Sequence, residues 1–157
     1  MLNAGQEFPS FELQDQNGKL VKLEDVRGHW VVFYVYPKDD TPGCTIEGKQ
    51  FSASKAEFEA AGAKIYGISP DGVKSHKDFC DKFEFSIDLL ADVETKLLTA
   101  LGVEQSEYKG NMYWNRVTFL VSPEGKIARA YDKVKPDGHD KQVLADLKEL
   151  KQQPVSH

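Results

Sequence analysis

The 157-residue sequence has only two cysteines, no long apolar run and no excess of positive charge. Two cysteines are fewer than a disulfide-stapled secreted domain usually carries. The longest apolar run, Trp30 to Tyr36, is the length of a strand, whereas a membrane-spanning helix needs about 20 residues. The net charge of −5 argues against a nucleic-acid partner, and no polybasic run indicates membrane binding.

The N-terminus also lacks a basic segment followed by an apolar one, so we expect no secretory signal and a cytoplasmic protein. In a reducing cytosol, a cysteine pair that does form a disulfide is usually transient and catalytic. The alternative is that Cys44 and Cys80 are two unrelated buried thiols that act as small hydrophobic residues.

Alternating apolar segments and turn residues predict the strands. Asn17-Gly18 indicates a hairpin within residues 11–24, and the unbroken apolar run that ends at Pro37 is typical of a strand buried on both faces. Residues 63–69, AKIYGIS, are predicted to form a second buried strand. Further strands are predicted over residues 86–90, 117–122 and 126–131, the last two joined as a hairpin.

Capping residues and apolar spacing predict the helices. Thr41 and Pro42 suit the start of a helix that ends near Gly62, in which Cys44, Phe51 and Phe58 share one face. The other helices are expected from Asp71 or Ser75 to about Phe85, over residues 93–101, and over residues 138–151.

This order of elements predicts an α/β protein of the thioredoxin-like class. Buried strands that alternate with helices imply a layered structure, and right-handed crossovers make the first two core strands parallel. The expected product is a mixed central sheet with helices on both faces and an N-terminal β-hairpin. We expect one domain over residues 1–157, with a frayed tail at 152–157.

The predicted helix places Cys44 in its first turn, directly after a buried strand. First-turn N–H groups have no intrahelical partner and, with the helix dipole, favour an anion. A thiolate is such an anion, and it is the reactive form of cysteine. Arg116, just before a predicted strand, could lower the thiol pKa further. We therefore expect Cys44 to be held ionised near neutral pH.

The same segment has the groups that peroxide reduction needs. A thiolate must attack one oxygen while the other leaves, so both oxygens have to be held in line. The Thr41 hydroxyl, the backbone N–H groups of Gly43 and Cys44, and Arg116 can bind them. Pro37 can exclude water without adding a competing donor.

The string PKDDTPGCT resembles the P-x-x-x-T-x-x-C signature of peroxiredoxins, with Pro37, Thr41 and Cys44 at its fixed positions. The segments GISPDGVKSHKDF, R-x-T-F and SPEGKI extend the likeness to the Q-type group over nearly the whole chain. The resemblance implies a thioredoxin-like fold and a cofactor-free peroxidase. It implies that Cys44 is the peroxidatic cysteine and that a dithiol reductant such as thioredoxin recycles the enzyme.

One position departs from many Q-type members, which carry a resolving cysteine five residues after the first. Here that residue is Lys49. Other members carry the resolving cysteine on the following helix, and Cys80, 36 residues after Cys44, matches them. The resemblance thus implies an intramolecular disulfide between Cys44 and Cys80, which favours a monomer. We expect both helices to unwind in part before the bond forms.

Other interpretations stay open. His76 and Cys80 share a helix face and with Cys44 could supply three zinc ligands, although an isolated helix histidine is usually solvated and we expect no metal. Asp39 and Asp40 are expected to solvate the loop rather than act as catalysts. The chain could also be a redox sensor that relays its disulfide to a partner.

Two further features adjoin Arg116 in the predicted site. Glu47 is expected to orient Arg116 rather than to exchange protons with substrate. The cluster of Tyr108, Met112, Tyr113 and Trp114 is interpreted as packing around the arginine, or else as an apolar rim that favours organic hydroperoxides.

Overall fold

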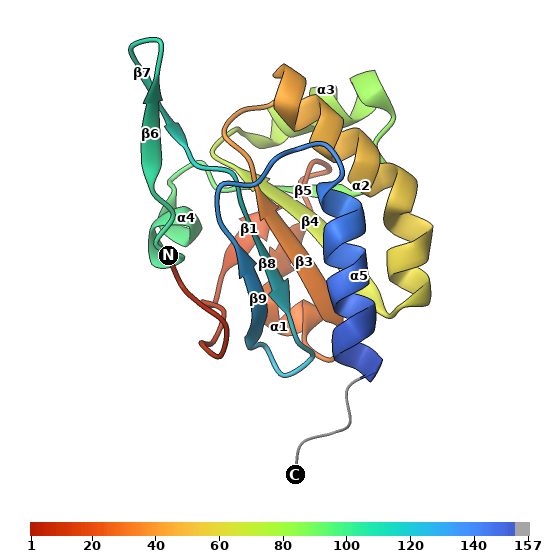
Figure 1. Cartoon of the computed structure of the whole chain (residues 1–157). Helices are drawn as coiled ribbons and strands as arrows, with labels where there is room; N and C mark the ends of the chain where they lie inside the picture. The colour runs from red at the N-terminus through yellow and green to blue at the C-terminus, as the bar shows by residue number, and fades with distance from the viewer. Residues whose placement is uncertain (153–157) are drawn as a thin grey trace.

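The computed structural model describes residues 1–152 and contains a central sheet of seven strands in the order β2-β1-β5-β4-β3-β8-β9 (Figure 1). The elements are β1 (Glu12–Gln14), β2 (Leu20–Lys22), α1 (Leu23–Val26), β3 (Trp30–Val35), α2 (Pro42–Ala60), β4 (Ala63–Ser69), α3 (Val73–Phe83), β5 (Asp88–Ala91), α4 (Lys96–Ala100), β6 (Gln105–Tyr108), β7 (Asn111–Trp114), β8 (Val117–Val121), β9 (Ile127–Tyr131) and α5 (His139–Gln152).

The sheet is mixed, as the sequence predicts. β3, β4 and β5 are parallel, while β8 runs antiparallel to β3 and forms a hairpin with β9. The N-terminal hairpin of β1 and β2 joins the other edge through β5. The thioredoxin-like α/β prediction is confirmed.

Helices cover both faces of this sheet, and both cysteines lie on the same side. α2, α3 and α5 pack on one face, in a cluster that includes Cys44, Phe51, Phe58 and Cys80. α1, α4 and the N-terminal segment cover the other face. β3 alternates between the two clusters, so its residues are buried on both sides, as its unbroken apolar run predicts.

Two helices differ in extent from the predictions. α3 begins at Val73 with Gly72 at its N-cap, because the Asp71 carboxylate is used elsewhere and accepts a hydrogen bond from the backbone N–H of Asp39. Instead of covering residues 93–101, α4 has one turn and a half, from Lys96 to Ala100. The buried Asp92 carboxylate accepts hydrogen bonds from the backbone N–H groups of Leu97 and Leu98 and so fixes where that helix starts.

A second hairpin, β6 with β7, was not predicted. It projects from the body of the molecule (Figure 1), and its Tyr108 and Met112 side chains are 62% and 58% exposed. The packing interpretation is therefore wrong for these two residues, whereas Trp114 does pack against the core. Most residues of β6 are polar, so the sequence shows no apolar pattern that would predict this strand.

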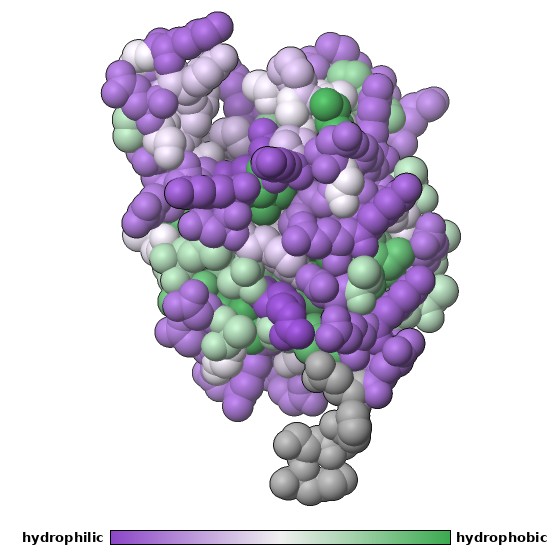
Figure 2. Space-filling view, viewed as in Figure 1, coloured by the Kyte–Doolittle hydropathy of each residue, from purple (hydrophilic) through white to green (hydrophobic). Residues whose placement is uncertain are grey.

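The surface otherwise matches the composition. On the face shown in Figure 2, hydrophobic residues form small patches between hydrophilic ones. Among residues 1–152, no helix is both long and apolar enough to cross a membrane. Of the predicted frayed tail, Gln152 is the last residue of α5, and 153–157 lie outside the described residues.

Helix α2 and the segment that follows α3 approach each other closely at Gly48. A Cβ atom there would overlap Cζ of Phe85. Phe85 in turn donates its backbone N–H to the carbonyl of Cys80. The absence of a side chain at Gly48 thus lets the end of the Cys80 helix pack directly against the Cys44 helix.

We predict that Gly48→Ala lowers the free energy of unfolding by roughly 1–3 kcal/mol, because the new methyl group overpacks the contact. In a Phe85→Ala background the sign should reverse, since alanine is favoured over glycine within a helix by about 1 kcal/mol. Denaturant unfolding of the four proteins measures both effects. Ala53→Gly, at an exposed position of α2, is the control and should cost the same in both backgrounds. Simple additivity of Gly48→Ala and Phe85→Ala would contradict the proposed contact.

Candidate active site

The site is built on the turn that begins α2. Thr41 is the N-cap residue and Pro42 occupies the first helical position, as predicted. The Thr41 hydroxyl does not cap the helix but donates to the carbonyl of Lys38 at 3.1 Å. Cys44 follows in the first turn and is only 1% exposed. Pro37 is half-buried just after β3, where the chain leaves the sheet.

Arg116 reaches this turn because of the sheet. It directly precedes β8, whose first residue, Val117, pairs with Val35 at the end of β3. Its Nη1 donates to Cys44 Sγ at 3.4 Å and to Glu47 Oε1 at 2.9 Å. The structure therefore brings Arg116 to Cys44, and it places Glu47 where the sequence suggested, against the guanidinium.

Gly43 allows the guanidinium to come this close. A Cβ atom at this position would lie 2.9 Å from Arg116 Nη2 and 3.3 Å from Pro136 Cγ. Its backbone conformation is not of the left-handed type, so the requirement for glycine is one of space. Thr41, Gly43, Cys44 and Arg116 thus converge on one turn.

The electrostatics of Cys44 differ from the expectation. Burial raises the pKa of the thiol above its ordinary value, while the Arg116 guanidinium, the Thr41 hydroxyl and the Lys38 backbone lower it only in part. The predicted lowering of this pKa is wrong in this structure, where the thiol pKa is raised. Desolvation of a fully packed sulfur outweighs the partners that favour its charge.

Glu47 is a second buried acid at the same guanidinium. Its side chain is 0% exposed, and its Oε2 has no hydrogen-bond partner among the described residues. Burial raises its pKa to about 7, against the opposing charge and hydrogen bond of Arg116. The site therefore holds a carboxyl group that titrates near neutrality.

Cys80 lies on α3 and is 6% exposed. Burial, with Asp39 next in effect, raises its pKa to about 12. Cys80 packs in the same apolar cluster as Cys44. Both cysteines are free thiols in this conformation.

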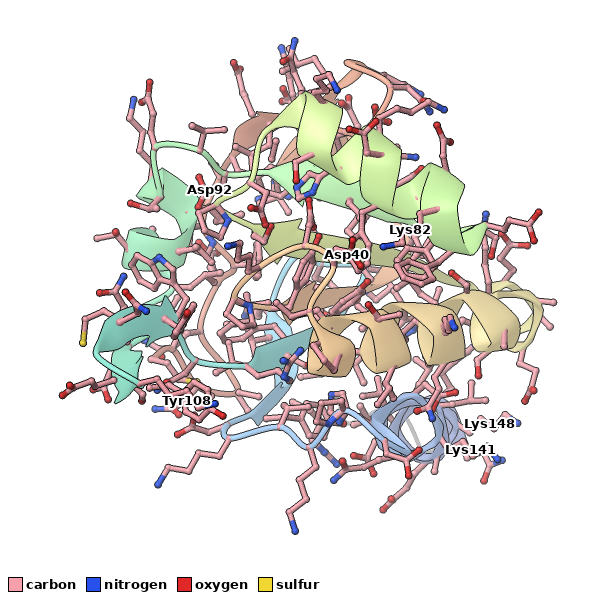
Figure 3. All side chains as sticks on the ribbon, turned by 90° about the horizontal axis from the view of Figure 1, so that it is seen from above. Asp40, Lys82, Asp92, Tyr108, Lys141 and Lys148 are labelled. Atoms are coloured by element: carbon pink, nitrogen blue, oxygen red, sulfur yellow. The ribbon has the colours of Figure 1, made fainter. Side chains whose placement is uncertain are left out.

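His76 and Asp39 are buried, which the sequence analysis missed. His76 is 0% exposed, with Nδ1 2.8 Å from Asp39 Oδ2 and Nε2 3.0 Å from the carbonyl of Leu90. Both ring nitrogens are thus engaged, and no group of three or more potential ligands that could hold a metal ion occurs within residues 1–152. Asp39 does not solvate the loop; Asp40 is exposed and pairs with Lys82 of α3 (Figure 3).

Known proteins resemble this chain over most of its length. Residues 4–130 match the AhpC/TSA family. The chain belongs to the AhpC/TSA family. It is 47% identical over 137 residues to Peroxiredoxin Bcp of Xanthomonas campestris, which covers 83% of this chain and 84% of that one. It is 38% identical over 152 residues to Peroxiredoxin Bcp of Bacillus subtilis, covering 95% and 97%.

Solved AhpC/TSA structures are also similar. A mutant of Xylella fastidiosa PrxQ has a TM-score of 0.92 at 32% identity, covering 97% of this chain and 99% of its own. A trapped-complex structure of the Xanthomonas campestris bacterioferritin comigratory protein, studied for alkyl peroxide reduction, has a TM-score of 0.88 at 41% identity, covering 96% and 100%. The prediction of a Q-type peroxiredoxin, a thiol peroxidase, is confirmed.

The raised pKa of Glu47 predicts a stability change with pH. Its contribution is present below its ordinary pKa and is lost as the pH rises through about 7, because the folded protein holds the proton more tightly. We expect the unfolding free energy of the wild type to fall, relative to Glu47→Gln, by roughly 1–3 kcal/mol between about pH 4.5 and pH 8. Urea unfolding at several pH values measures this difference. A difference that does not change with pH would mean that Glu47 ionises normally.

Proposed function

We propose that Cys44 is the peroxidatic cysteine and Cys80 the resolving cysteine of this peroxidase. The observation that carries the proposal is the hydrogen bond from Arg116 to Cys44 Sγ within the first turn of α2. Arg116, Thr41 and the Lys38 backbone favour the charged form of that sulfur. A buried structural thiol needs none of these neighbours.

The first step is attack of the Cys44 thiolate on one peroxide oxygen. A new S–O bond forms as the O–O bond breaks, which leaves a sulfenic acid on Cys44, and the departing oxygen takes up a proton as water or an alcohol. Arg116 and the first-turn N–H groups of Gly43 and Cys44 would hold the two oxygens, with the Thr41 hydroxyl beside them. Pro37 would keep water from the pocket.

We propose hydrogen peroxide and organic hydroperoxides as substrates. Alkyl peroxide reduction is reported for the Xanthomonas relative, which is 41% identical to this chain. The β6–β7 hairpin leads directly to Arg116 and exposes Tyr108 and Met112, which suits an apolar substituent on the peroxide. Tyr108 is labelled on this hairpin in Figure 3.

In the second step, Cys80 attacks the sulfenic sulfur, and a disulfide and water form. Solved structures of the Xanthomonas protein include variants with serine in place of either of two cysteines that lie 36 positions apart, the separation of Cys44 and Cys80. With a pKa of about 12, the packed Cys80 thiol is a poor nucleophile, so it must leave its place in α3 to react.

A dithiol protein such as thioredoxin would then reduce the disulfide by exchange. Because both cysteines belong to one chain, the cycle needs no second subunit, and we propose a monomer. A temporary disulfide also fits a reducing compartment, so we place the protein in the cytoplasm.

The intramolecular disulfide is tested by mass spectrometry after one equivalent of peroxide. The wild type should lose two hydrogens within a monomer, since the two thiols become one disulfide. Cys80→Ser should instead retain a sulfenic acid at Cys44, trapped with dimedone, or form a disulfide-linked dimer. Cys44→Ser is the control and should not react. A wild type that yields only a Cys44 sulfenic acid or a linked dimer, without loss of two hydrogens in the monomer, would contradict the Cys44–Cys80 disulfide.

The role of Arg116 separates a peroxidase from a redox sensor. Arg116→Leu should lower the rate of peroxide consumption by about 100-fold or more, because one preorganised donor and its charge are lost. Arg116→Lys keeps the positive charge but lacks the planar guanidinium, so its rate of peroxide consumption should lie between those of the wild type and Arg116→Leu. The measurement is steady-state turnover with a thioredoxin system. Rapid single oxidation of the wild type with negligible turnover would indicate the sensor instead.

A further inference from the structure

A buried polar network joins the loop before α2 to helix α3. Asp39 lies in that loop and is 8% exposed. Its Oδ1 accepts a hydrogen bond from the Tyr36 hydroxyl at 2.6 Å, and its Oδ2 accepts one from the Ser75 hydroxyl at 2.7 Å. His76 Nδ1 lies 2.8 Å from the same Oδ2. Ser75 and His76 of α3 thus both contact the Asp39 carboxylate in the loop before α2.

The arrangement of acceptors around His76 indicates how firmly it is held. Its Nδ1 faces the Asp39 carboxylate, and its Nε2 faces the carbonyl of Leu90 in β5 at 3.0 Å. A carboxylate and a carbonyl both accept, so a ring that carries two protons satisfies both. The contact is shielded from solvent, and removal of one partner leaves the other buried and poorly satisfied.

The network connects the two segments that carry the cysteines. Asp39 precedes Cys44 by five residues, and His76 precedes Cys80 by four, so His76 and Cys80 lie one turn apart on the same side of α3. In this arrangement Cys44 contacts Arg116, and Cys80 stays within its helix. Figure 3 shows the loop and α3 facing each other at Asp40 and Lys82.

We propose that Asp39 and His76 are positioning residues that hold the two cysteine segments in the peroxide-reducing arrangement and must separate before the disulfide forms. The inference rests on the proposed roles of Cys44 and Cys80. The network would set how the sulfenic acid is divided between two reactions. In one, it condenses with the Cys80 thiol to give the disulfide and water; in the other, a second hydroperoxide oxidises it to the sulfinic acid and leaves as an alcohol or water.

The test compares the two fates of the sulfenic acid in His76→Asn and in the milder Ser75→Ala, which removes one hydrogen bond to Asp39. After rapid mixing with peroxide, acid-quenched samples are alkylated, and the thiol, disulfide and sulfinic forms are counted by mass spectrometry. Disulfide formation should be at least threefold faster in both variants, and the sulfinic fraction at excess peroxide should fall by a similar factor. The rate of the first oxidation should change much less.

The control is Lys82→Ala. Lys82 pairs with Asp40 at 2.7 Å and so bridges the same loop and helix, but the two side chains are 58% and 48% exposed. Water replaces such an exposed ion pair at little cost in free energy. This variant should therefore give the same ratio of disulfide to sulfinic product as the wild type. Asp39→Asn keeps the shape of the side chain without its charge and should fall between the wild type and His76→Asn.

Two results would overturn the inference. An unchanged ratio of disulfide to sulfinic product in Ser75→Ala and His76→Asn would show that the network does not control resolution. If both oxidation steps slow together as the melting temperature falls, the network is merely structural. Should His76→Asn fail to fold, Ser75→Ala and Asp39→Asn decide. Failure of the proposed function itself looks different, because the wild type would then form no Cys44–Cys80 disulfide at all.

Discussion

The chemistry of this protein depends on one guanidinium placed between two buried acids. Arg116 donates from the same nitrogen to Cys44 Sγ and to Glu47 Oε1, and burial raises the pKa of both acids. Without Arg116 the pKa of each acid would be raised further. The positive charge that favours the reactive thiolate therefore comes from a residue 72 positions away in the chain.

The sheet explains how that residue arrives. β3 and β8 pair antiparallel, so the residue before Val117 must lie near the end of β3, where the chain turns into α2. The pairing of Val117 with Val35 fixes the backbone next to Arg116, whereas an unpaired loop would let the guanidinium move away from the sulfur. Gly43 completes the fit, since any side chain there would meet the guanidinium. The motif around Cys44 and the register of a distant strand are thus two parts of one site.

Local signals in the sequence were sufficient for much of this. Thr41 and Pro42 mark the start of α2, the apolar run marks β3, and the cysteine motif singles out Cys44. Arg116 stands out because it directly precedes a predicted strand. The errors concern residues whose partners lie far along the chain. His76 looks like a solvated helix residue until the fold sets it against Asp39, 37 positions earlier. For Cys44 the sequence predicts the wrong direction of the pKa shift, because it shows the partners of the thiol but not how deeply the thiol is buried.

The depth of burial also creates a conflict within the catalytic cycle. Close packing brings Cys44 to Arg116, but it keeps Cys80 in a helix where its pKa is about 12. One rigid structure cannot serve both steps, because the second needs the thiols of two helices to meet. Phe85 joins the segment after α3 to Gly48 of α2, and His76 joins α3 to Asp39 in the loop before α2. These contacts therefore affect the rate of resolution as well as stability. Stronger contacts at these two places would favour the first oxidation. They would also leave the sulfenic acid exposed to a second peroxide for longer.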